Sequence, residues 1–277
     1  MAKNKRISRL KPVEADLRDA TLAPSTPQTE APAYRLAFAD QEFMKHEALR
    51  PVRLQLELLK PEMVLSEAGV ASTVVLFGGA RIPEPGKEAW AGKTPEIRAR
   101  LEANSRYYEE AREFARIASR ESLKSGGKEF VVCTGGGPGV MEAGNRGAED
   151  VGAASIGLNI VLPHEQAPNP YVSPQFCFNF HYFAVRKMHF LMRAKAVAAF
   201  PGGFGTMDEL FEALTLIQTG RAAPMPVLLF GESFWRRMVN FEALAEEGVI
   251  SPEDLKLFSF VDDAASGWEI VRDWYKL

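Results

Sequence analysis

Short runs of apolar residues alternate along the chain with segments whose apolar residues recur at helical spacing. Five runs predict buried strands: TVVLFGG (73–79), EFVVCTGGG (129–137), ASIGLNIVLP (154–163), AVAAFPGG (196–203) and MPVLLFG (225–231). The run FCFNFHYF (176–183) is compatible with a sixth strand. The segments between and after them predict helices at 99–123, 138–150, 184–195, 206–219, near 232–247 and at 264–275.

Strands that alternate with helices indicate βαβ units with right-handed crossovers. We therefore expect an α/β fold, a Rossmann-like doubly wound parallel sheet in three layers. In such a sheet the carboxyl ends of the strands share one edge, and ligands bind along that edge.

The N-terminal part of the chain departs from this alternation. Residues 1–35 are rich in charge, Pro, Thr and Ala, which predicts a disordered or loosely attached tail. Residues 36–69 predict a helical extension, because LRPVRLQLELLKPEMVL carries apolar residues at mixed helical spacing, interrupted by Pro51 and Pro61. The alternating nucleotide-binding domain then occupies residues 70–277.

Three of the predicted strands end in glycine-rich turns, FGGAR (77–81), TGGGPG (134–139) and PGGFGT (201–206). We expect residues 78–79, 135–139 and 202–205 to lie on one edge of the sheet. Each turn leads toward a helix N-terminus, whose free N–H groups and positive dipole suit a phosphate. The alternative is that the glycines only form tight turns.

Other phosphate-binding signatures are not met. After Gly135 the glycine spacing departs from G-x-G-x-x-G, and G-x-x-x-x-G-K-[ST] is absent. No acidic residue evidently closes the second predicted strand. An NAD(P)-dependent oxidoreductase is therefore disfavoured.

Charge and composition exclude several classes of partner. A net charge of −3 gives no general attraction to nucleic acid or anionic membranes, so any phosphate must be held locally. No apolar run approaches the ~18 residues of a membrane span. Cys133 and Cys177 form no redox or disulfide pattern, and no apolar signal region follows the basic start of the chain. We expect a cytoplasmic protein with neither nucleic acid nor membrane as a partner.

The segment PGGFGTMDE carries further chemistry. Thr206 is suited to cap the helix that follows, and Asp208 and Glu209 then fall in its first turn. Glu209 lies three residues beyond Thr206, so both can face the ligand edge. Arg186 and Lys187 lie on the preceding helix. Plain capping by the acids and a solvated surface position for the basic pair are the alternatives.

The stretches GGGPGVMEAGNRGA (135–148) and PGGFGTMDE (201–209), with VRK (185–187) between them, resemble the LOG family. That family comprises cytokinin riboside 5′-monophosphate phosphoribohydrolases and related nucleotide N-glycosidases, long labelled "lysine decarboxylase". Its signature is P-G-G-x-G-T-x-x-E preceded by an Arg-Lys pair. The family's essential Arg and Glu lie 23 residues apart, as do Arg186 and Glu209. The resemblance covers roughly residues 70–245.

The resemblance implies that Arg186 and Glu209 form the catalytic pair. It implies substrate-binding roles for Lys187, Gly202, Gly203, Phe204, Gly205, Thr206, Thr215 and, in LPHEQ, Glu165. Within the other two glycine turns and the helix after them, the candidate substrate-binding residues are Gly78, Gly136, Gly137 and Met141. The expected reaction is hydrolysis of the N-glycosidic bond of AMP or a cytokinin riboside 5′-monophosphate, giving free base and ribose 5-phosphate.

The expected enzyme needs no cofactor and no metal, since its four histidines form no ligand-spaced cluster. A pyridoxal-dependent decarboxylase would need Lys187 or Lys195 for a Schiff base, but the phosphate loop and the acid are explained without one. A non-catalytic carrier or sensor of a nucleotide or nucleotide-like cofactor is the main alternative. A pure binder does not require the Arg186 and Glu209 pair, which favours the enzyme.

The predicted helix 206–219 has a wide apolar surface. Its apolar residues include Leu210, Phe211, Leu214, Leu216 and Ile217, a set broader than one stripe facing a sheet. We therefore expect a homodimer with this helix or the 184–195 helix at the interface, as the resemblance also suggests. The alternative is that residues 36–66 cover this helix.

Overall fold

The computed structural model describes residues 11–163 and 167–277 and contains two compact units, Met1–Leu56 and Glu57–Leu277. The smaller unit consists of short helices, α1 (Val13–Thr21), α2 (Gln41–Met44) and the first turns of α3 (Arg50–Glu67), joined by 3₁₀ turns. Most of its described side chains are exposed. The Asp40 side chain caps α2 by accepting hydrogen bonds from the N–H groups of Glu42 and Phe43.

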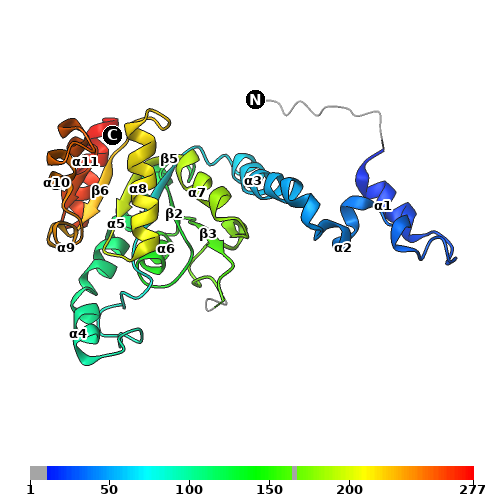
Figure 1. Ribbon diagram of the computed structural model, residues 1–277, viewed down its shortest axis with the longest axis horizontal. Coiled ribbons are helices and arrows are strands. Elements are labelled where there is room, and N and C mark those ends of the chain that lie inside the picture. The colour runs from blue at the N-terminus through cyan, green and yellow to red at the C-terminus, as the bar shows by residue number, and fades with distance from the viewer. Residues whose placement is uncertain (1–10, 164–166) are drawn as a thin grey trace. The chain divides into compact units, whose positions relative to one another are not determined.

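The larger unit is built on one seven-stranded sheet with the order β4-β3-β2-β1-β5-β6-β7 (Figure 1). The strands are β1 (Thr73–Phe77), β2 (Val131–Thr134), β3 (Ile156–Ile160), β4 (Cys177–Phe180), β5 (Ala194–Ala199), β6 (Val227–Phe230) and β7 (Ser259–Val261). All the neighbouring strands pair in parallel. The predicted α/β fold with a doubly wound parallel sheet is therefore confirmed. The pattern did not predict β7, which has only three residues.

Helices cover both faces of this sheet and make the two outer layers (Figure 1). They are α4 (Pro95–Ala103), α5 (Arg106–Lys124), α6 (Val140–Glu149), α7 (Phe183–Met192), α8 (Phe204–Gln218), α9 (Glu232–Met238), α10 (Phe241–Glu246) and α11 (Ala264–Tyr275). Across residues 11–163 and 167–277, no helix is both long enough and apolar enough to cross a bilayer.

Two predicted helices are each divided into two. The predicted helix at 99–123 is α4 followed by α5, because Thr94 caps α4 with Pro95 in its first turn, and that helix ends at Asn104. The predicted helix near 232–247 is α9 followed by α10, because the Asn240 side chain accepts a hydrogen bond from Ala243 N–H and starts a new helix.

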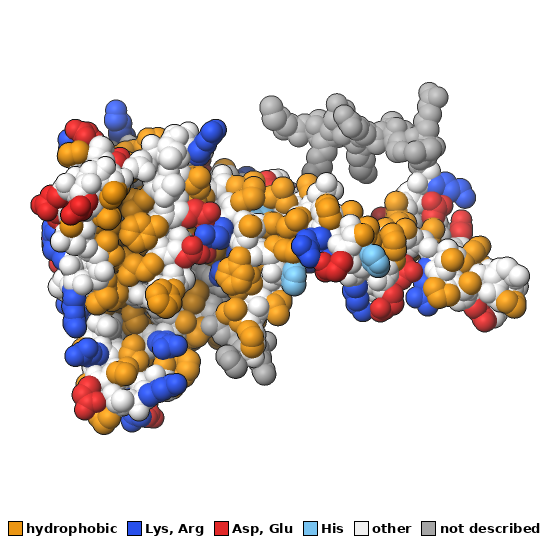
Figure 2. Space-filling model, in the orientation of Figure 1, with side chains coloured by type: hydrophobic (Ala, Val, Ile, Leu, Met, Phe, Trp, Pro, Cys, Tyr) orange, Lys and Arg blue, Asp and Glu red, His pale blue; other side chains and the backbone are white. Residues whose placement is uncertain are grey.

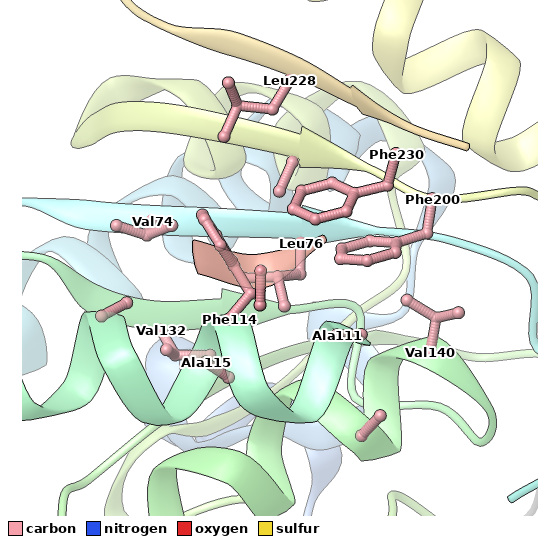
Figure 3. Close-up of a cluster of buried hydrophobic side chains, with 14 of the residues drawn as sticks. Val74, Leu76, Ala111, Phe114, Ala115, Val132, Val140, Phe200, Leu228 and Phe230 are labelled. Atoms are coloured by element: carbon pink, nitrogen blue, oxygen red, sulfur yellow. The ribbon is translucent and has the colours of Figure 1, made fainter. Parts of the chain in front are cut away.

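One apolar core joins the sheet to α5, α6 and α11. Figure 3 shows Phe114 of α5 among side chains from the sheet, including Leu76 and Phe230. Phe230 stacks on Phe200 with ring centroids 4.1 Å apart and meets Phe114 edge-on at 5.3 Å. On the opposite face, Phe77 of β1 packs edge-on against Phe190 of α7 at 4.9 Å. The sheet is thus buried on both faces, as its continuous apolar strands require.

The chain changes direction in the sheet at β1. It builds β2, β3 and β4 outward on one side of β1 and then returns to pair β5 with the other side. Ligands of open α/β sheets bind in the crevice at such a switch point, beyond the carboxyl ends of the strands. The three glycine turns follow β2, β1 and β5, which are adjacent and parallel, so their predicted placement on one edge is confirmed.

A buried polar network holds the turn after β2. Asn145 of α6 accepts a hydrogen bond from Thr134 Oγ1 at 2.7 Å and donates to Ser155 Oγ at 3.0 Å. Asn169 Nδ2 lies 2.9 Å from Asn145 Oδ1 and also contacts the carbonyl oxygens of Gly136 and Gly137. This network fixes the backbone of the turn.

Replacing Asn145 tests this network. Asn145→Ala leaves the buried polar groups of Thr134, Ser155 and Asn169 short of a partner, and we expect the free energy of unfolding to fall by about 3 kcal/mol. The matched control Asn179→Ala removes an exposed amide from β4 and should change stability by less than about 0.5 kcal/mol. Chemical denaturation of both variants provides the measurement, and equal stabilities would contradict this role for Asn145.

Candidate functional site

A cavity of about 770 Å³ opens at the switch point, beyond the carboxyl ends of β1 and β5. Its walls are the turn after β1, the turn after β5 and the first turns of α8. The predicted site residues that line it are Gly78, Met141, Arg186, Gly202, Gly203, Phe204, Gly205, Thr206 and Glu209. The structure therefore brings most of the predicted site to one place.

The turn after β1 ties the other two glycine turns together. The Gly79 N–H donates to the Pro201 carbonyl at 2.9 Å, and the Gly79 carbonyl accepts from the Val140 N–H at the start of α6 at 3.3 Å. Gly78 packs so closely on Val140 that no side chain fits at position 78. The N-termini of α6 and α8 therefore stand beside one another at the cavity.

The start of α8 differs from the prediction. The helix begins at Phe204, with Gly203 as its N-cap, so Thr206 does not cap the helix and Glu209 lies in its second turn. The cause is local. The Thr206 side chain packs against Gly202 in the space that a Cβ at position 202 would occupy, and Thr206 is therefore part of the helix. Gly203 has no side chain with which to cap α8, and Gly203 and Gly205 both face open space. This helix end is open to an anion.

Glu209 and Arg186 meet at the inner end of the cavity. Glu209 Oε1 lies 3.9 Å from Arg186 Nη1, and about one-tenth of each side chain is exposed. Arg186 Nε donates to the Leu158 carbonyl of β3 at 2.7 Å, and its guanidinium lies 5.0 Å from the Phe190 ring centroid. A Cβ at Gly135 would lie 2.6 Å from Arg186 Nη2, so this glycine makes room for the guanidinium.

Burial dominates the protonation of Glu209. It raises the pKa of this carboxyl to about 7, although the positive charges of Arg186 and Lys187 oppose the rise. A plain cap near a helix start would be exposed and would have a low pKa. Glu209 instead gains and loses a proton near neutral pH, which suits general acid–base chemistry.

Lys187 contacts acids of α8. Its Nζ lies 3.0 Å from Asp208 Oδ1 and 3.1 Å from Glu212 Oε2, and the surrounding carboxylates raise its pKa against the effect of burial. Among the described residues that line the cavity, Asp208 appears but Lys187 and Glu212 do not. Lys187 thus ties α7 to α8 beside the site.

Three other predicted positions, Thr215, Gly136 and Gly137, lie apart from the cavity wall. Thr215 is exposed two turns further along α8, where its hydroxyl donates to the Phe211 carbonyl. Gly136 and Gly137 belong to the turn held by Asn169, and Gly136 has a φ of +75° with no room for a side chain against Asn159. Glu165 lies outside the described residues.

Several cavity residues were not predicted. They are contributed by segments far apart in the chain and include Arg81, Leu101, Asn104, Phe183, Phe234 and Met238. Arg81 belongs to the FGGAR turn, but no pattern in the sequence indicates a role for its charge. The apolar ones resemble ordinary core residues in the sequence, so only their position identifies them.

The described residues offer no evident metal site, since they contain no group of three or more His, Cys, Asp and Glu side chains suited to hold an ion. Cys133 and Cys177 are free thiols. Burial raises the pKa of Cys133 to about 12, which makes it a poor nucleophile at neutral pH.

Sequence comparisons match the part of the chain that contains this site. The family model described as "Possible lysine decarboxylase" matches residues 141–271. Cytokinin riboside 5′-monophosphate phosphoribohydrolase LOG3 of Arabidopsis thaliana is 29% identical over 125 residues, which are 44% of this chain and 57% of that protein. Probable cytokinin riboside 5′-monophosphate phosphoribohydrolase LOG4 of Oryza sativa subsp. japonica is 27% identical over 137 residues, 48% of this chain and 58% of that protein. The chain spans little more than half the length of these relatives.

A more distant likeness links the chain to solved structures. The molybdenum cofactor carrier protein of Chlamydomonas reinhardtii superposes with a TM-score of 0.47 at 18% identity, covering 74% of this chain and 99% of that one. The family match, over residues 141–271, includes both Arg186 and Glu209. The resemblance to the LOG family that these motifs predict is therefore confirmed.

Proposed function

We propose that this chain hydrolyses the N-glycosidic bond of a nucleoside 5′-monophosphate. The observation that carries the proposal is Glu209, a carboxyl buried in the cavity at the switch point, with a pKa of about 7 and Arg186 at 3.9 Å. A site that only binds a nucleotide gains nothing from such a costly buried acid. An enzyme that moves a proton near neutral pH needs one.

The 5′-phosphate is best placed at the N-terminus of α8. A Cβ at Gly203 or Gly205 would meet no atom within 4 Å, both glycines line the cavity, and the dipole of α8 favours an anion at this helix start. Glu209 follows in the next turn of the same helix. Binding the phosphate therefore positions the ribose C1′ with respect to the acid, and this binding energy lowers the barrier to the reaction.

The reaction needs a new bond from a water oxygen to C1′ and loss of the bond from C1′ to the base nitrogen. The electron pair of the broken bond leaves with the base, which takes up a proton from solvent, and Glu209 afterwards returns the proton of the attacking water to solvent. The sugar passes through an oxocarbenium-like state, whose positive charge the Glu209 carboxylate stabilises while it accepts the proton of the attacking water. Arg186, held by the Leu158 carbonyl, keeps Glu209 in place or contacts the ribose or phosphate.

The names of the relatives, which specify cytokinin riboside 5′-monophosphates, support a nucleoside 5′-monophosphate as the substrate class. We extend this to the present chain as AMP or an N6-substituted AMP. The unpredicted apolar walls of the cavity, including Leu101, Phe234 and Met238, suit the faces of a purine.

Glu209→Gln tests the acid. The change keeps the size of the side chain and removes its charge, so base release from AMP should fall by about 10²-fold or more. Nucleotide affinity should persist, because the amides at 203–205 are unchanged. Chromatography of free adenine and titration of AMP binding on one preparation measure both quantities. Glu247→Gln, the same change at an exposed glutamate that does not line the cavity, is the matched control.

The outcome of this test separates two functions. Near-normal base release by Glu209→Gln would remove the role given to Glu209. If the unchanged protein binds AMP but releases no base from any nucleoside monophosphate, it is a carrier or sensor.

The pH dependence provides a second test. The reaction uses the ionised form of Glu209, and burial raises its pKa to about 7. Activity measured as kcat/KM should therefore rise with pH through about 7 and lie on a plateau above it. An ordinary exposed glutamate would give a limb near pH ~4.3. An activity that is flat between pH 5.5 and about 8 would contradict the buried acid as the reacting group.

We also propose that the chain forms a homodimer through α7 and α8. Leu210 and Ile217 of α8 are buried within the larger unit. Other apolar side chains on α7 and α8 remain exposed. They are Phe183, Met188 and Met192 on α7, with Phe204 and Phe211 on α8. Figure 2 shows apolar side chains gathered on the face of the larger unit that α8 occupies. Exposed patches of this kind mark association surfaces.

Light scattering at micromolar concentration tests this interface. We expect the mass of a dimer for the unchanged chain and a shift toward the monomer for Met188→Glu, since a buried charge opposes association. Leu123→Glu places the same charge on another exposed apolar position, in α5, and should leave the mass unchanged. A monomer at this concentration would contradict the proposal.

A further inference from the structure

The helix that carries Arg186 lacks a cap of its own. Tyr182, which precedes α7, is not a residue type that caps helices well, and the first turn of α7 contains no acid. The N–H groups of the two residues just before α7 are bound by a residue more than a hundred positions earlier in the chain. Glu57 of α3 accepts a hydrogen bond from His181 N–H at 2.8 Å and from Tyr182 N–H at 3.0 Å. This carboxylate also places a negative charge at the positive end of the helix.

The other end of α7 is bound to the same helix. Arg193, the C-cap residue of α7, donates from Nη2 to Glu62 Oε2 at 3.1 Å and to Ser66 Oγ at 3.0 Å. Its Nε donates to the Val70 carbonyl at 3.3 Å, just after α3. Arg193 is about seven-eighths buried, so this contact is shielded from solvent.

The spacing of these contacts matches the length of α7. Nine residues separate Glu57 from Ser66, which corresponds to about 13.5 Å of helix, and the ten residues of α7 span about 15 Å. Glu57 lies at the start of α7 and Ser66 at its end, so residues 57–67 of α3 run in the same direction as α7. Buried His189 of α7 lies between the two sets of contacts, with Nδ1 3.8 Å from Glu62 Oε1.

We propose that Glu57 is a positioning residue that sets the place of Arg186 in the active site, an inference that rests on the function proposed above. The Arg186 N–H donates to the Tyr182 carbonyl, so Arg186 stands one turn from the amides that Glu57 holds. The guanidinium must reach both the Leu158 carbonyl and Glu209. A movement of this turn by a fraction of an ångström changes both distances, and small displacements of reacting groups have large effects on rate.

If Glu57 positions Arg186, Glu57 also influences the pKa of Glu209. The positive charge of Arg186 lowers the pKa of Glu209 against the effect of burial. If Arg186 moves away from Glu209, the pKa of Glu209 must rise. Removal of the Glu57 carboxylate should therefore move the pH limb of the reaction upward, as well as slow the reaction.

The experiment compares three variants of the full chain. Glu57→Ala removes both hydrogen bonds and the charge, and Glu57→Gln keeps one acceptor oxygen without the charge. Glu67→Ala is the matched control, since Glu67 is an exposed glutamate on the same helix. Each variant is measured for adenine release from AMP between pH 5.5 and about 9, and for hydrogen exchange of the amides at 181–187.

We expect Glu57→Ala to lower kcat about tenfold, with KM changed by less than about twofold because the phosphate is bound at α8. Its pH limb should move to higher pH, and the amides of His181 and Tyr182 should exchange about tenfold faster. Glu57→Gln should lie between Glu57→Ala and the unchanged chain. Glu67→Ala should match the unchanged chain in all three measurements.

The outcomes distinguish this inference from the proposed function. If Glu57→Ala has the kcat, pH limb and exchange rates of Glu67→Ala, Glu57 does not position α7 and the inference is wrong. A lower melting temperature with an unmoved pH limb also overturns it, because that result marks a purely structural residue. If the unchanged chain releases no base, the proposed function fails, and slower or unchanged exchange at 181–187 in Glu57→Ala then rejects the positioning of α7 independently.

Discussion

The pairing of β5 with β1 is the constraint on which the rest of the molecule depends. The chain forms β1 to β4 first and then returns to the centre of the sheet as β5. The turn after β5 therefore lies beside the turn after β1. The Gly79 N–H bond to the Pro201 carbonyl links these turns directly. This single pairing creates the crevice of the switch point and places the start of α8 beside it. The glycines of the two turns have no side chains that would fill the crevice.

That crevice makes the burial of a charged group possible. Glu209 reaches the cavity from the second turn of α8, where neighbouring elements exclude water and raise its pKa to about 7. Arg186 comes from α7, which precedes β5 in the chain, whereas α8 follows β5. The Leu158 carbonyl accepts a hydrogen bond from the Arg186 guanidinium. A carboxyl and a guanidinium 3.9 Å apart, each about nine-tenths buried, interact more strongly than they would at a surface.

Two polar arrangements keep these parts in register, and both join distant segments. Asn145 and Asn169 fix the turn after β2. Gly135 of this turn lies against the Arg186 guanidinium. Glu57 and Glu62 of α3 bind the two ends of α7. The part of α3 from Glu57 onward thus holds α7 within the larger unit. It does so with carboxylates at a helix start and at an arginine, which complement the charges already there.

The sequence by itself determined the type of each main element, the parallel sheet and the glycine turns at one edge, and the resemblance to the LOG family implied that Arg186 and Glu209 act as a pair. These depend on local periodicity and on short motifs, and both can be read over a few residues. It misplaced the start of α8 by two residues, because the packing of Thr206 on Gly202 is a contact between backbone and side chain that capping preference does not contain. Only the tertiary structure showed that Lys187 pairs with Asp208 and Glu212, that Thr215 stands apart, and that Glu57 caps α7. Pairings between residues so far apart in the chain depend on how the elements pack, and no local pattern encodes that.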